Sequence, residues 1–137
     1  MADMLRLSEA TALGLHAMAI VAEQEKAISV TDAAKRLNAS SAHLSKVMQR
    51  LGKAGLLRAK RGPSGGYTLA RPAAEINLLE IYETLEGPIR QDGCLFEAPV
   101  CQRVHCILGG LVERVRTQVH EQFRTTTLAD IVEGNGR

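Results

Sequence analysis

Three cysteines, Cys94, Cys101 and Cys106, lie close together in the second half of the sequence. Their spacing, C-x6-C-x4-C, places three thiols within thirteen residues. Thiolates this close in sequence can converge on one metal centre without a folded core between them, as in iron–sulfur and zinc sites. An odd set of cysteines in one short segment does not suit a disulfide framework. The segment therefore predicts metal binding or thiol redox chemistry.

Three alternatives to an iron–sulfur cluster stay open for this segment. Zinc could bind the same thiols with His105 as a fourth ligand. Three buried thiols could instead pack as small hydrophobic side chains, although the polar neighbours Gln91, Asp92 and Glu97 disfavour this interpretation. A thiol–disulfide switch without metal is the third alternative.

A second group of chemically suited residues is basic. Up to Arg71 the chain holds eleven Lys and Arg against five Asp and Glu, whereas the remainder holds six against ten. Six basic residues follow one another without an intervening acid: Lys46, Arg50, Lys53, Arg58, Lys60 and Arg61. This concentration suits contacts with phosphates, and a solvated charged face is the alternative. We therefore expect the first half of the chain to bind a polyanion.

Apolar spacing and capping residues predict the helices that position these basic groups. A first helix is expected over about residues 8–22, with Ser8 as its cap. Ser29 and Ser40 are placed to begin two further helices, which stop near Asn38 and before Gly55. Two short helices joined by a tight turn form a helix-turn-helix.

A glycine-rich turn follows these helices between two predicted strands, residues 56–60 and 67–70. The turn has neither the GxGxxG spacing nor the Gly-Lys-Ser/Thr ending of nucleotide-phosphate loops. Glycines at a hairpin tip allow the backbone to approach a ligand closely, which suits a DNA groove. The hairpin is therefore expected to be a wing.

The expected ligand of this half is double-stranded DNA, because the N-terminal part of a recognition helix enters the major groove. The predicted DNA contacts are Ser40, Ser41, His43, Ser45, Lys46 and Arg50 on the helix and Arg61, Gly62, Pro63, Gly65, Gly66 and Tyr67 on the wing. No membrane partner is expected, because no apolar run approaches roughly 18 residues. The N-terminus lacks the apolar region of a signal peptide, which predicts a cytoplasmic protein.

The second half of the chain predicts three more helices. Asn77 and Glu80 form a capping box for a helix that ends at Gly87. A long helix with an apolar seam over 107–124 favours a homodimer interface, with packing inside one protomer as the alternative. Thr127 and Asp130 begin a short last helix. The sequence shows no paired acid and base in a segment that would form a pocket, so we do not expect an enzyme.

The expected fold class is mostly α with a small β-hairpin wing: a winged helix-turn-helix domain plus a long dimerisation helix. The expected organisation has four parts. These are a winged helix-turn-helix domain (1–88), a cysteine cluster-binding loop (89–106), the dimerisation and C-terminal helices (107–133) and a disordered tail (134–137).

Several motifs, taken in order, resemble a known family. They are Leu5-Arg6-Leu7-Ser8, Leu51-Gly52-Lys53-Ala54-Gly55-Leu56, Arg61-Gly62-Pro63-Ser64-Gly65-Gly66-Tyr67-Thr68-Leu69-Ala70, Glu86-Gly87-Pro88 and Thr127-Leu128-Ala129-Asp130. They are similar to those of winged-helix regulators that include the iron–sulfur assembly regulator IscR and the nitric-oxide-sensing repressor NsrR. The resemblance spans nearly the whole chain. It implies a homodimer on a palindromic operator and a [2Fe–2S] or [4Fe–4S] cluster on Cys94, Cys101 and Cys106. A repressor that senses redox, nitric oxide or iron–sulfur status is the function we expect.

The sequence also departs from this family pattern. Its cysteine spacing is not the C-x5-C-x5-C of some members, and Ala12 and Gly109 occupy the positions of the usual non-cysteine ligands. His105, Glu9 and His16 are therefore the candidates for a fourth ligand. A zinc-bound or metal-free thiol switch is the alternative regulator, and a redox or metal protein that does not bind DNA is the alternative outside this class.

Overall fold

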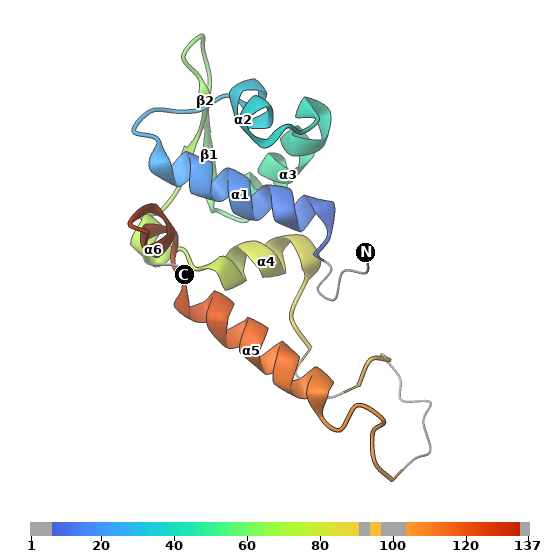
Figure 1. Ribbon diagram of the computed structural model, residues 1–137. Helices are drawn as coiled ribbons and strands as arrows, with labels where there is room; N and C mark the ends of the chain where they lie inside the picture. Colours follow the sequence, from blue (N-terminus) through green and yellow to red (C-terminus); the bar gives the residue numbers. More distant parts are fainter. Residues whose placement is uncertain (1–6, 91–93, 97–103, 135–137) are drawn as a thin grey trace.

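The computed structural model describes residues 7–90, 94–96 and 104–134, which form a helical molecule with one β-hairpin (Figure 1). Its elements are α1 (Glu9–Glu23), α2 (Val30–Leu37), α3 (Ser41–Lys53), β1 (Leu57–Lys60), β2 (Gly66–Leu69), a 3-10 turn (Ala73–Glu75), α4 (Leu78–Glu86), α5 (Leu111–Thr125) and α6 (Leu128–Val132). The predicted fold class is confirmed.

Side-chain caps explain where most of these helices begin. The N-caps of α1, α2, α3, α4 and α6 are Ser8, Ser29, Ser40, Asn77 and Thr127, and each side chain accepts a hydrogen bond from a backbone amide three residues later. Such a bond satisfies one of the amides that the first helical turn leaves unpaired. At Asn77 and Thr127 the reciprocal bond completes a capping box. These helix starts agree with the sequence predictions.

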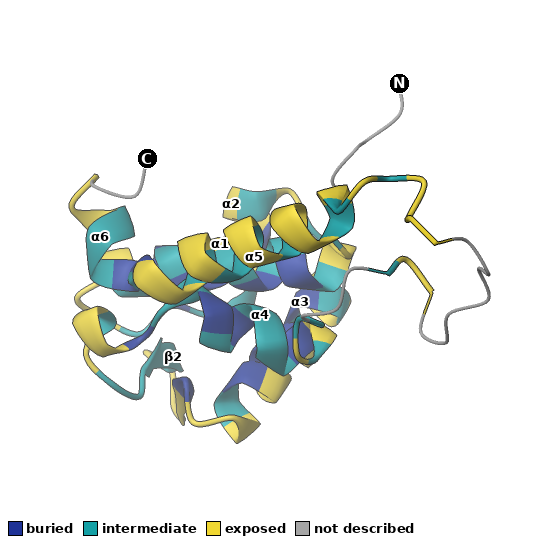
Figure 2. Ribbon diagram, turned by 90° about the horizontal axis from the view of Figure 1, so that it is seen from below, coloured by how far each residue is buried: buried dark blue, intermediate teal, exposed yellow. Residues whose placement is uncertain are grey.

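The core lies between α1, α3 and α4 (Figure 2). From α3, Leu44 and Met48 are fully buried, and they join Met18 of α1 in one apolar cluster. Gly14 allows α1 to approach α4 closely, because a Cβ there would collide with the side chain of Leu85. The core therefore fixes α3, the predicted recognition helix, against α1.

The hairpin is tied to the helix-turn-helix through a third backbone segment. Strands β1 and β2 are antiparallel, with Lys60 opposite Gly66 at the tip. Ile28, just before α2, exchanges two hydrogen bonds with Tyr67, at 3.1 and 2.8 Å. Gly66 fits there because a Cβ would collide with the Ile28 carbonyl. These bonds hold the wing beside α2 and α3.

The last long helix begins later than expected. Gly109 and Gly110 have φ values of 58° and 82°, so the chain turns there, and α5 begins at Leu111 rather than near residue 107. Helix α5 then runs along α4, with the rings of Tyr82 and Phe123 5.5 Å apart (Figure 1). None of the described helices is both long and apolar enough to cross a membrane. Most of the predicted tail, residues 135–137, lies outside the described residues.

Candidate DNA interface and cysteine segment

The predicted DNA-reading elements lie together at one end of the molecule. Helices α2 and α3 and the hairpin lie on one side of α1, opposite α5 (Figure 1). At the start of α3, Ser40 and Ser41 are exposed, and Ser40 Oγ accepts a hydrogen bond from the His43 amide at 3.3 Å. One turn further, Lys46 is exposed and Ser45 is half-buried. The first half of α3 therefore presents short polar side chains and one cation.

The wing adds more exposed cations to this end. Of the predicted wing contacts, Arg61, Gly62 and Pro63 are exposed, whereas Gly65, Gly66 and Tyr67 are half-buried. A hydrogen bond of 2.9 Å from the Gly65 amide to the Gly62 carbonyl closes the turn. Among the residues that the structure describes, no carboxylate forms an ion pair with Lys46, Lys53, Arg58, Lys60 or Arg61. Their charges are therefore available to a polyanion.

Arg50, which is predicted to contact a DNA phosphate, is exposed and also forms hydrogen bonds within the protein. Its Nη2 donates hydrogen bonds to the carbonyls of Thr84 at 3.2 Å and Leu85 at 2.9 Å. Both carbonyls belong to the last turn of α4, where the helix has no further amides of its own to satisfy them. Arg50 thus joins the recognition helix to the end of α4.

A buried polar contact that the sequence analysis did not single out lies beside this junction. Thr11 is fully buried in α1, and its hydroxyl donates to Glu86 Oε1 at 2.6 Å. Hydrogen bonds from Ser8 and Thr11, with a smaller contribution from the charge of Arg50, lower the pKa of the Glu86 carboxyl. A threonine on the buried face of a helix was the available signal, because buried hydroxyls need partners.

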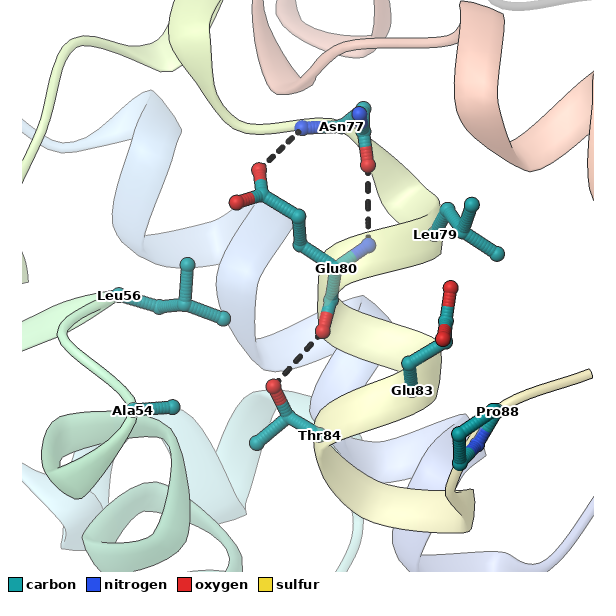
Figure 3. A pocket seen from close by; sticks show the side chains of 8 residues that line it. All are labelled: Ala54, Leu56, Asn77, Leu79, Glu80, Glu83, Thr84 and Pro88. Carbon is teal, nitrogen blue, oxygen red and sulfur yellow. Dashed lines mark hydrogen bonds between the residues drawn. The ribbon is translucent and has the colours of Figure 1, made fainter.

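A cavity of about 440 Å³ lies between the end of α3 and α4 (Figure 3). It is lined by Ala54, Leu56, Asn77, Leu79, Glu80, Glu83, Thr84 and Pro88. Its Asn77 and Glu80 form the α4 capping box, and Arg71 Nη2 donates to Glu80 Oε1 at 2.8 Å. Thr84 donates to the Glu80 carbonyl at 2.7 Å. These polar groups therefore stabilise α4, and the cavity carries no catalytic constellation.

The cysteine segment connects α4 to α5. Cys94 is half-buried, and its carbonyl accepts a hydrogen bond of 2.7 Å from Arg116 of α5. Cys106 is an exposed free thiol whose Sγ lies 3.5 Å from the Leu108 amide. The third predicted ligand, Cys101, lies outside the described residues. The structure thus places the first predicted ligand against α5 and the last just before it.

The candidates for a fourth ligand are divided between two regions. His105 is exposed beside Cys106. Glu9 and His16 lie on α1 and line a cavity of about 220 Å³ with Leu37 of α2. Glu9 Oε1 is 3.8 Å from His43 Nδ1, and His16 Nδ1 is 2.7 Å from the Ala12 carbonyl. Of the three candidates, only His105 lies in the cysteine segment.

The donor set fits a soft metal centre by its chemistry, because thiolates bind iron–sulfur clusters and zinc. Within residues 7–90, 94–96 and 104–134, however, no three Cys, His, Asp or Glu side chains are grouped to hold a metal ion. A metal centre in this segment would therefore need a ligand from outside the described residues, and Cys101 is the one that the sequence predicts.

A comparison with protein families decides the class of this winged-helix protein. The sequence model of the Rrf2 family, described as iron-dependent transcriptional regulator, matches residues 7–134. The chain belongs to the Rrf2 family. Its members are transcriptional regulators rather than enzymes, so the chain is a DNA-binding transcriptional regulator.

Individual Rrf2 relatives agree with this assignment. IscR of Cereibacter sphaeroides is 33% identical over 113 residues, which cover 80% of this chain and 73% of the relative. CymR, the global cysteine regulator of B. subtilis, superposes with a TM-score of 0.78 and 31% identity over 95% of this chain and 98% of that one. IscR of T. potens superposes with a TM-score of 0.77 and 28% identity, over 96% of this chain and 88% of that one. The family resemblance inferred from the sequence is therefore confirmed.

Proposed function

We propose that this Rrf2 regulator is a homodimeric repressor of palindromic DNA sites that senses redox, nitric oxide or iron–sulfur status through an iron–sulfur cluster. The single observation that carries the DNA-binding part is the grouping of exposed cations on α3 and the wing. The proposed DNA contacts are Ser40, Ser41, His43, Ser45 and Lys46 on α3 and Arg61, Gly62, Pro63, Gly65, Gly66 and Tyr67 on the wing. Phosphate contacts set the position on the duplex, and contacts of α3 with base edges set the sequence preference.

The exposed apolar side of α5 supports dimerisation. None of its described residues is buried, and Leu111 and Val115, one turn apart, are 44% and 41% exposed. A helix gains most of its stability in water from packing an apolar face, and here α4 covers only part of that face. A second copy of α5 is the occupant we propose. Two-fold symmetry would then present two recognition helices to a palindromic site.

In the proposed sensor Cys94, Cys101 and Cys106 hold the cluster, and His105 is the candidate for a further ligand within the same segment. When bound, the cluster supplies a centre that oxidants and nitric oxide can destroy. Loss of the cluster would release the three thiolates, and the segment between α4 and α5 would lose its cross-link.

A thiol switch without metal is the second candidate. The observation that favours it is the exposed, free Cys106 thiol, together with the absence of a three-ligand group among the described residues. Exposed thiols are the ones that oxidants reach. In this case Cys106 would form a disulfide with another cysteine of the segment.

Anaerobic purification followed by absorption spectroscopy and iron, sulfide and zinc analysis tests the proposal. We expect a coloured protein whose visible charge-transfer bands are lost in Cys101→Ala, with an altered affinity for an operator selected in vitro. Glu25→Ala, an exposed change in the segment between α1 and α2, is the control and should keep the cluster. A colourless protein, with stoichiometric zinc or with no metal after reconstitution, would exclude the cluster. Mass spectrometry after mild oxidation would then test the thiol switch.

A further inference from the structure

Arg50 links two parts of the molecule that the proposed function treats separately. It lies on the recognition helix, yet its guanidinium donates to the carbonyls of Thr84 and Leu85, which are 34 and 35 residues away. A cation at the C-terminal end of a helix is also favoured by the partial negative charge there. One side chain of α3 therefore caps the last turn of α4.

The same turn of α4 is held from a second side. Glu86, the last residue of α4, accepts the hydrogen bond from Thr11, and Ser8 donates to Thr11 Oγ1 at 3.1 Å. Both Ser8 and Thr11 belong to the start of α1. The end of α4 is thus bound by α1 through a carboxylate and by α3 through an arginine.

The cysteine segment begins directly after this junction. Gly87 ends α4 with φ of 90°, and its amide bonds to the Glu83 carbonyl at 2.9 Å. Pro88 follows, and the chain reaches Cys94, whose carbonyl is held by Arg116. Only six residues lie between Gly87 and Cys94 in the sequence. The cysteine segment is therefore continuous in the chain with the turn that Arg50 caps.

We propose that Arg50 is a positioning residue of the DNA-binding unit and that its hydrogen bonds to the α4 end make the placement of α3 depend on the state of the cysteine segment. The second half of this statement rests on the proposed function, in which the cysteine segment is the sensor. A sensor changes DNA affinity only if its two states favour different arrangements of the DNA-binding unit. The Arg50 contact adds a directional hydrogen-bonded link to the packing of α3 on α4, at the residues that lead into the segment.

The salt dependence of DNA binding separates positioning from a phosphate contact. The measurement uses the full-length protein and a duplex selected in vitro with the wild type. Lys46→Ala should reduce the magnitude of the negative slope of log K against log salt by about 0.9, because it removes one phosphate contact. Arg50→Ala should weaken binding about tenfold at every salt concentration and leave the slope unchanged. A slope reduced in magnitude as in Lys46→Ala would overturn the positioning role.

Arg50→Lys keeps the charge and guards against a folding defect in Arg50→Ala. An ammonium would retain a phosphate contact, but it lacks the rigid planar guanidinium whose Nη2 donates to both carbonyls. Arg50→Lys should therefore bind as weakly as Arg50→Ala. Hydrogen exchange of the Gly87 amide should become faster in Arg50→Lys but not in Lys46→Ala. Rescue of affinity by lysine with unchanged exchange would contradict the inference.

A double-mutant cycle with Cys101→Ala tests the coupling. In the wild-type background the proposed function predicts a change in operator affinity when Cys101 is replaced. In the Arg50→Lys background that change should shrink to less than about twofold, because the two sites no longer interact. An undiminished change would overturn the coupling and leave the proposed sensor standing. No change in either background would reject both sensor and coupling, whereas the salt slopes would still decide the positioning role.

Discussion

The two halves of this Rrf2 regulator differ in how far each can hold its own structure. In the helix-turn-helix half every helix begins with a side-chain cap. Helix α3 by itself contributes four buried side chains to the core, Leu44, Val47, Met48 and Leu51. In the second half α5 begins at Leu111, after the N-cap Gly110, without a side-chain cap and buries none of its residues. Burial of apolar surface is the main favourable term in folding. The first half is therefore stabilised from within, whereas α5 contributes no buried side chain to the protomer.

Cavity-forming substitutions give the largest expected difference between the halves. Leu44→Ala removes a fully buried side chain and should lower the free energy of unfolding by about 2–5 kcal/mol. Leu111→Ala makes the same chemical change at a position that is 44% exposed, so it should cost less than about 1 kcal/mol within the protomer. Urea unfolding followed by circular dichroism provides both values.

Protein concentration sharpens this comparison. Stability that comes from association rises with protein concentration, whereas stability from a protomer's own core does not. Leu44→Ala should therefore lower the stability equally at two concentrations a hundredfold apart. Leu111→Ala should reduce the concentration dependence. Equal losses at both concentrations for the two variants would show that the α5 face is not an interface.

Two glycines give the next largest contrast. Gly66, with φ of 146°, has no room for a side chain, because a Cβ would meet the backbone of Ile28. Gly109 has φ of 58°, but nothing lies within 4 Å of a Cβ built there. Gly66→Ala should destabilise the protein by about 2–3 kcal/mol and weaken DNA binding by displacing the wing. Gly109→Ala should cost about 1 kcal/mol, the strain of the left-handed backbone alone. Thermal unfolding and operator titration of the two variants provide the comparison. If the wing were loosely held, Gly66→Ala would be the less damaging of the two.

The same contrast explains how much the sequence could predict. The starts of α1, α2, α3 and α4 depend on local signals, a capping side chain followed by an apolar stripe, and they were predicted correctly. The start of α5 was placed too early, because Leu108 fits the apolar spacing of the helix that follows. Gly109 and Gly110 end that pattern with positive φ values, which periodicity alone does not reveal.

The candidate site was predictable in kind but not in its contacts. The helical spacing of the apolar residues in α3 predicted correctly that Lys46 is exposed. Helical geometry also placed Arg50 on the polar face, but it could not show that two carbonyls 34 and 35 residues away would engage that side chain. The contact between Thr11 and Glu86 could not be predicted either, because the two residues lie 75 positions apart in the sequence. Contacts between elements depend on the packing of the whole fold, which a local pattern does not contain.

Acid stability gives the smallest and most local test of the helix-turn-helix half. The pKa of Glu86 in the folded protein is lowered from its ordinary value of 4.5 by hydrogen bonds from Ser8 and Thr11. A carboxyl with a lowered folded pKa contributes stability above its unfolded pKa and loses it as the pH falls through the folded value. Acidification below pH 4.5 should therefore weaken the junction of α1 with α4.

Glu86→Gln removes this titration, so its free energy of unfolding should fall less between pH 7 and acid than that of the wild type. The difference should be no more than about 1 kcal/mol, because Glu86 is exposed and solvent screens its interactions. Glu83→Gln, on the same helix, is the matched control for the loss of one carboxylate. Urea unfolding of the three proteins across this pH range provides the comparison. If Glu86→Gln lost as much stability in acid as the wild type, the Ser8 and Thr11 contacts would not stabilise the carboxylate in solution, and α4 would be held at this end by Arg50 without them.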